Sequence, residues 1–178
     1  GATWLVAADD VADPDTWSRV ARTALDCGAR IISSTSADHD AAVARISHLG
    51  HVLAEALALA GGRGGDLALA LAAGSFRDGT RVAGSAPDLV RAICEPNRDA
   101  LLTVLDECLG DLGAAREALA ERGTLGPLVD EGHRARGAYE AVQAGRADAV
   151  VTVTPGAPGW LEALRRAGAD GMEVRPAG

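Results

Sequence analysis

The feature that most constrains the fold is a helical period that runs through residues 36–147. Apolar residues recur there every three or four positions, and short stretches such as GGRGGD and GSFRDGT interrupt them. A spacing near 3.6 is that of an amphipathic helix, and nothing in this part alternates as a strand does. The sequence therefore predicts a mainly α protein built from several helices.

The longest predicted helix opens at Asn97, which follows a proline and suits an N-cap. Apolar residues form a seam along it, in steps of four and three: Leu101, Leu105, Cys108, Leu112, Ala115 and Leu119. Such a seam is typical of a helix that packs against another helix, in its own chain or in a second copy. We therefore expect a dimer.

The two ends of the chain are different from its middle. Each has two short apolar runs around a helical segment, with Asp13 and Pro14 as the expected start of the first helix and Gly28 as its stop. Two strands alone do not make a stable sheet, so the opening resembles the end of a larger one. We expect a remnant strand-helix-strand in residues 1–35, a helical domain in 36–147 and a small strand-helix-strand tail in 148–178.

Composition excludes several classes of protein. The net charge is -8 and every basic residue other than histidine is an arginine, without a basic stripe, so neither nucleic acid nor a membrane surface is expected as a partner. No apolar stretch is long enough to span a bilayer or resembles a secretion signal. The three cysteines are widely spaced and form no C-x-x-C motif, which favours a reducing, cytoplasmic location.

Polar residues form a stripe on an otherwise aliphatic helix. At 100° per residue, His48, His51 and Glu55 share one face. The opposite face is aliphatic: Val43, Ile46, Leu49, Leu53, Leu57 and Ala60. The stripe could be a solvated back face, a metal site that lacks an apparent fourth ligand, or a pair of histidines that donate hydrogen bonds to an anionic or hydroxylated ligand. We expect no bound metal.

An arginine-containing loop follows between two predicted helices. Arg77 and Arg81 flank Asp78 among small residues that would let a ligand approach the backbone. An arginine binds a carboxylate bidentately and keeps its charge when water is excluded. A salt bridge from either arginine to Asp78 that only pins the loop is the equal alternative.

Together these segments resemble the helical C-terminal domain of prephenate dehydrogenases. The resemblance rests on three stretches in the family's order and spacing, which cover most of residues 37–120: HDAAVARISHLGHVLAEAL, GSFRDGTRVAGSAPDLVRAI and the asparagine of CEPNRDALL. It implies an intertwined homodimer and a preceding Rossmann domain for NAD or NADP, of which residues 1–35 would be the end. It also implies oxidative decarboxylation of prephenate, or the corresponding reaction of arogenate, with L-tyrosine as a candidate inhibitor.

The resemblance also assigns site residues. Arg81 matches the arginine that clamps a prephenate carboxylate, and Asp78 and Gly74 match positions that line that pocket. His48 matches a histidine that faces the substrate cleft and is associated with tyrosine feedback. His39 matches a histidine at the head of the helix, where a packing role is equally compatible, and His51 stays a candidate ligand contact from the stripe.

Two departures from the family limit the assignment. Gly50 stands where proline is usual, which should leave the helix straighter, and Val90 stands where relatives often carry a tryptophan. The general-base histidine and the G-x-G-x-x-G fingerprint would lie upstream, so we expect neither catalytic nor cofactor-binding residues here, and no activity from these residues alone. GGRGGD follows a helix and is no substitute.

Two functions from other classes remain alternatives. One is a non-catalytic dimeric helical module that binds an aromatic acid or a protein partner, and the other is a metal-dependent helical-bundle enzyme.

Overall fold

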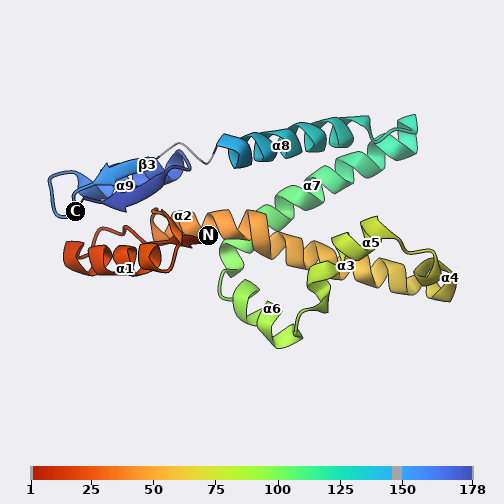
Figure 1. The fold of residues 1–178 in the computed structure, drawn as a ribbon. Helices are drawn as coiled ribbons and strands as arrows, with labels where there is room; N and C mark the ends of the chain where they lie inside the picture. The colour runs from red at the N-terminus through yellow and green to blue at the C-terminus, as the bar shows by residue number, and fades with distance from the viewer. Residues whose placement is uncertain (1, 146–149, 178) are drawn as a thin grey trace. The chain divides into compact units, whose positions relative to one another are not determined.

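The computed structural model describes residues 2–145 and 150–177, and most of them are helical (Figure 1). Within residues 36–145 every regular element is a helix, as the period predicted. The predicted end of the helical domain at residue 147 lies outside the described residues. In chain order the elements are β1 (Thr3–Leu5), α1 (Pro14–Asp26), β2 (Arg30–Ile32), α2 (Ser36–Val43), η1 (Ala44–His48), α3 (Leu49–Arg63), α4 (Gly65–Ala70), α5 (Gly74–Gly79), η2 (Arg81–Gly84), α6 (Pro87–Cys94), α7 (Arg98–Arg122), α8 (Gly126–Gly145), β3 (Val150–Val153), α9 (Trp160–Ala169) and β4 (Glu173–Pro176).

The contacts divide the chain into two compact units. One unit joins Gly1–His39 to Gly123–Gly178, and the other is Asp40–Arg122. The first therefore combines the two ends of the chain, which the sequence assigned to separate segments. The division into a remnant of a larger domain (1–35), a helical domain (36–147) and a small tail (148–178) stays a prediction.

The first unit contains two pairs of parallel strands. β1 pairs with β2 from Thr3 opposite Arg30 to Leu5 opposite Ile32, and β3 pairs with β4. A parallel pair needs a crossover connection, and α1 and α9 supply one each. Both strand-helix-strand predictions are confirmed. The predicted start of the tail at residue 148 lies outside the described residues.

Helix α1 has the ends that the sequence predicted. The carboxylate of Asp13 accepts a hydrogen bond from the Thr16 amide at 2.8 Å, and Pro14 occupies the first turn. After the helix, Gly28 has a positive φ of 73°, a conformation that costs glycine little.

The core of the first unit is shared by the opening and the tail. Trp17 of α1 meets Trp160 of α9 edge to face, with 6.1 Å between the ring centroids. Ile31 of β2, Leu164 of α9 and Val174 of β4 are all fully buried in the same cluster. Figure 1 labels α1, α9 and β3 within this unit. Residues 150–177 thus complete a core that the opening strands could not close alone.

An ion cluster joins β2 to β4 in this unit. Glu173 is buried and accepts hydrogen bonds from Arg30 Nε at 3.0 Å and from Arg175 Nε at 2.9 Å. Burial works to raise the pKa of the Glu173 carboxyl, but the hydrogen bonds and the positive charges of the two arginines together outweigh it and lower the pKa. The cluster satisfies a carboxylate that would otherwise be costly to bury.

In the helical unit, the long helix that carries the histidines is not a plain α-helix. A π-helical turn, η1, connects α2 to α3 and ends at His48. The α-helix then continues through Gly50 to Arg63. The straight helix expected around Gly50 is therefore preceded by a wider turn, and such turns are often found at functional sites.

The apolar surface of this unit is extensive in the single chain. Ile46 is 82% exposed although the helical period grouped it with an aliphatic face. On α7, Leu112 and Leu119 of the predicted seam are 47% and 51% exposed, whereas Ala115 is buried. Helix packing within the chain thus covers only part of the seam.

Across residues 2–145 and 150–177, none of the helices combines the length and hydropathy that crossing a membrane requires.

Candidate functional site

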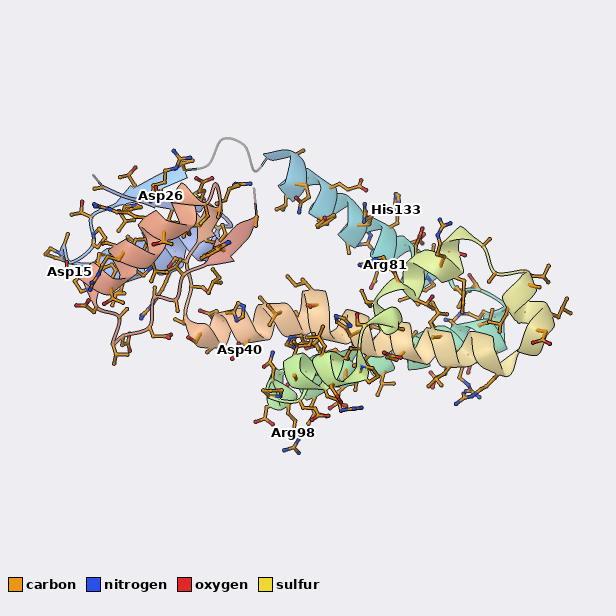
Figure 2. All side chains as sticks on the ribbon, turned by 60° about the horizontal axis from the view of Figure 1, so that its bottom comes forward. Asp15, Asp26, Asp40, Arg81, Arg98 and His133 are labelled. Carbon is orange, nitrogen blue, oxygen red and sulfur yellow. The ribbon has the colours of Figure 1, made fainter. Side chains whose placement is uncertain are left out.

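His48 ends the π-helical turn and is 7% exposed. Its ring nitrogen Nδ1 lies 3.3 Å from Nδ2 of Asn97, and the same Nδ2 donates a hydrogen bond to the backbone carbonyl of Asp40 at 2.7 Å. Asp40 lies within α2, and Arg98, the residue after Asn97, begins α7; Figure 2 labels both. The interpretation of this stripe as a solvated face is therefore wrong for His48, because neighbouring helices cover it.

Asn97 occupies the predicted N-cap position of α7. Its backbone carbonyl accepts the first helical hydrogen bond from the Leu101 amide at 3.0 Å. Its side chain, however, reaches back to α2 and η1, a contact across 57 residues to Asp40. No local pattern could have predicted that contact, since a cap preference depends only on neighbours in sequence.

A bidentate ion pair fixes η1 against α7. Arg45 Nη2 donates to Glu107 Oε1 at 2.9 Å, and Arg45 Nη1 donates to the other carboxylate oxygen at 2.5 Å. The hydrogen bond from Arg45 lowers the pKa of the Glu107 carboxyl. The pair is half exposed, so it orients the two helices more than it stabilises them.

The other members of the stripe are half-buried. His51 follows one turn into α3, and its Nδ1 is enclosed without a hydrogen-bond partner in the described part of the chain. Glu55 lies one turn further and is also partly covered. His39 lies in α2, where its amide donates to the Thr35 carbonyl at 3.0 Å.

The arginine loop packs on α3. α5 and η2 both contact this helix, and Gly79 approaches Leu57 so closely that an added Cβ would lie 2.8 Å from Leu57 Cδ2. Gly74 begins α5, with open space around it except for Arg77 Nη2 at 3.8 Å from a Cβ position. The loop is therefore seated on the helix that carries the histidines.

The two arginines of the loop differ in their partners. Arg77 Nε bonds Asp78 at 3.2 Å, with both side chains largely exposed. Arg81, which is labelled in Figure 2, begins η2 and is exposed. No residue in the described ranges forms a hydrogen bond or ion pair with it. The loop-pinning interpretation thus holds for Arg77, whereas Arg81 keeps an unpaired charge.

His48 lies on η1 and Arg81 lies on η2. Both elements contact α3, but at different positions along its axis. Leu57, which contacts the loop, comes nine residues after His48, roughly 13 Å along the axis and half a turn around it. The chain then returns toward η1, because α6 contacts that turn. A pocket shared by these two side chains stays a prediction.

Neither a metal site nor a dinucleotide turn is apparent in the described ranges. They contain no group of three or more histidine, cysteine, aspartate or glutamate side chains arranged to hold an ion. The glycine-rich run GGRGGD lies where α3 ends and α4 begins, not after a strand. It therefore lacks the strand-turn-helix geometry that binds a pyrophosphate.

Comparison with known proteins identifies the helical part. A model of the prephenate dehydrogenase dimerization domain matches residues 35–127. A cyclohexadienyl dehydrogenase of Zymomonas mobilis is 39% identical over 99 residues, which are 53% of this chain and 34% of that protein.

Two solved structures are similar. A Corynebacterium glutamicum protein described as a candidate prephenate dehydrogenase has a TM-score of 0.91 and 43% identity, over 98% of this chain and 57% of its own. Synechocystis arogenate dehydrogenase has a TM-score of 0.68 and 29% identity, over 77% of this chain and 52% of its own. The chain thus spans about a third of the Zymomonas protein and little more than half of each structure. The chain belongs to the prephenate dehydrogenase family, and its residues 35–127 match the family's dimerization domain.

Proposed function

We propose that the chain is the substrate-binding and dimerisation part of a dehydrogenase that converts prephenate to 4-hydroxyphenylpyruvate, with loss of CO2, in tyrosine biosynthesis. The observation that carries this proposal is the family match over residues 35–127, which contains both His48 and Arg81. The names of the relatives, cyclohexadienyl and arogenate dehydrogenase, make arogenate the alternative substrate.

Arg81 is the proposed carboxylate clamp. Its guanidinium is exposed and unpaired among the described residues, while the neighbouring Arg77 is engaged by Asp78. An arginine without an internal partner can bind both oxygens of a carboxylate, and prephenate carries two carboxylates. Asp78 and Gly74 would line the same pocket, with the small Gly74 leaving room beside the backbone.

The histidines are the proposed polar wall of the substrate site. His48 is held in place by the packing of η1 and by Asn97, so its ring would not need to be ordered by the ligand. His51 has an enclosed nitrogen with no hydrogen-bond partner among the described residues, which a ligand or a water molecule would satisfy. His39, in α2, is the third candidate among the histidines.

The proposed reaction uses NAD or NADP as the oxidant. The described residues do not fit a dinucleotide, because their glycine-rich run follows α3 and not a strand, and we assign none of them to cofactor binding. Their proposed part is to bind and orient the substrate, whose aromatisation favours decarboxylation.

We also propose that the protein is a cytoplasmic homodimer with L-tyrosine as a candidate inhibitor. Exposed leucines on α7 and the exposure of α8 support an interface between two copies, since large apolar faces are usually covered. An intertwined arrangement would cover both helices at once. The three cysteines are unpaired, in keeping with a reducing compartment.

Titration of prephenate into the protein tests the site. Replacing Arg81 by alanine should weaken binding by about tenfold to a hundredfold, because a hydrogen-bonded charge pair contributes about 1.5–3 kcal/mol. Arg77→Ala is the matched control, since that arginine is already paired with Asp78. Equal losses in the two variants, or none in either, would refute the role of Arg81, and competition by arogenate and L-tyrosine in the same titration would rank the ligands.

A further inference from the structure

We propose that Asn97 is a positioning residue that keeps the proton of neutral His48 on Nε2, so that His48 presents a hydrogen-bond donor to an oxygen atom of the substrate. The part that concerns the substrate rests on the function proposed above. The part that concerns the proton rests on the geometry of three residues and stands by itself.

The first step is the orientation of the Asn97 amide. Nitrogen and oxygen of an amide are exchangeable by a flip unless their neighbours distinguish them. Here the backbone carbonyl of Asp40, which can only accept, lies 2.7 Å from the terminal atom of Asn97. That atom must therefore be the NH2 group, with the amide oxygen on the other side.

The second step is the proton of His48. The same NH2 group has a second hydrogen, and His48 Nδ1 lies 3.3 Å from it. An NH2 group has no lone pair to offer, so Nδ1 can take part only as an acceptor. A neutral imidazole with an accepting Nδ1 carries its proton on Nε2, since the hydrogen bond of one ring nitrogen decides the state of the other.

The third step is the exposure of Nε2 of His48. Among the described residues, the fully enclosed side-chain nitrogens without a partner are those of Trp17 and His51. His48 Nε2 has no hydrogen-bond partner in the same ranges and is not one of them, so the small exposed part of His48 includes this nitrogen. The ring thus has one nitrogen anchored inside and one donor that reaches the surface.

Two features keep this arrangement rigid. Asn97 is fixed at the start of α7, where its carbonyl accepts from Leu101. The turn that ends in His48 is tied to α7 by the pair of Arg45 and Glu107. His48 and Asn97 are therefore both attached to α7, which suits a positioning role for Asn97.

The test compares the protein with its Asn97→Asp and Asn97→Ser variants. Aspartate and serine are both good N-caps, so α7 should keep its start and the melting temperature checks this. Nitrogen-15 NMR of the His48 ring, at about pH 8 where histidine is ordinarily neutral, distinguishes protonated from bare ring nitrogens. The protein should have Nε2 protonated, Asn97→Asp should move the proton toward Nδ1, and Asn97→Ser should give a mixture.

Prephenate titration of the same variants completes the test. Asn97→Asp should weaken binding by about tenfold, and Asn97→Ser by less. A proton on Nδ1 in the unsubstituted protein, or the same proton position in all three proteins, would overturn the inference. If the proton moves as expected but prephenate does not bind even the unsubstituted protein, the proposed function fails while the role of Asn97 toward His48 stands.

Discussion

Replacing Gly168 by alanine should destabilise the unit that joins the two ends of the chain. Gly168 lies in α9 where the helix crosses the end of β2. A Cβ at this position would lie 2.8 Å from the carbonyl carbon of Ser33 and closer still to its oxygen. The obstacle is backbone, and Ser33 is further fixed by a 2.6 Å hydrogen bond from its hydroxyl to the Val6 carbonyl.

The size of the effect follows from that distance. Carbon atoms pack best at about 3.5–4.0 Å, so α9 would have to move away by roughly 0.7 Å or more. Overpacking costs about 1–3 kcal/mol, and the upper part of that range applies here because a backbone obstacle cannot rotate away; alanine gains back up to about 1 kcal/mol of helix propensity. A net loss of about 1–2 kcal/mol should lower the melting temperature by about 2–8 °C for a chain of this size.

Tryptophan fluorescence during thermal unfolding is the appropriate assay. All three tryptophans, Trp4, Trp17 and Trp160, lie in this unit, so their signal reports its unfolding and not that of the helical unit. Gly137→Ala in α8 is the matched control, because Gly137 is helical and belongs to the same unit but has no described atom within 4 Å of a Cβ position. Its melting temperature should stay the same or rise.

An unchanged tryptophan transition in Gly168→Ala would refute the close approach of α9 to β2. A fall of similar size in the Gly137 control would assign the effect to something other than that contact.

Glu173→Gln should lower the free energy of unfolding by about 1–3 kcal/mol near neutral pH, because two arginines lose a charged acceptor. The pKa of Glu173 is lowered in the folded protein, so the stabilisation by its charge is present above the ordinary glutamate value of 4.5 and is lost as pH falls through the folded value. Urea titrations at several pH values should show the unfolding free energies of the original protein and the variant converging in acid. A difference between them that persists in acid would contradict this. Leu112→Asp should dissociate or precipitate a dimer that uses α7, with Val11→Asp as a control at another aliphatic site, which is 93% exposed. Light scattering after size exclusion measures the mass, and a Leu112→Asp protein with the mass and stability of the original would exclude α7 from the interface.

Local signals in the sequence determined the helices and their ends. Asp13, Pro14 and Gly28 bound α1 as predicted, and the period of apolar residues predicted a helical middle between two strand-helix-strand segments. These features depend on residues a few positions apart, so neighbouring residues suffice to predict them. The family resemblance likewise depends on ordered short motifs, and the match over residues 35–127 confirms it.

Only the tertiary structure decided which side chains meet. Arg30 and Glu173 are 143 positions apart, and Asn97 and His48 are 49 apart, yet each pair is in contact. A helical wheel could not show that a π-helical turn ends at His48, nor that Ile46 stays exposed in the single chain. Contacts of this kind depend on how whole helices and strands pack, and no short stretch of sequence carries a signal for the partner that lies opposite it.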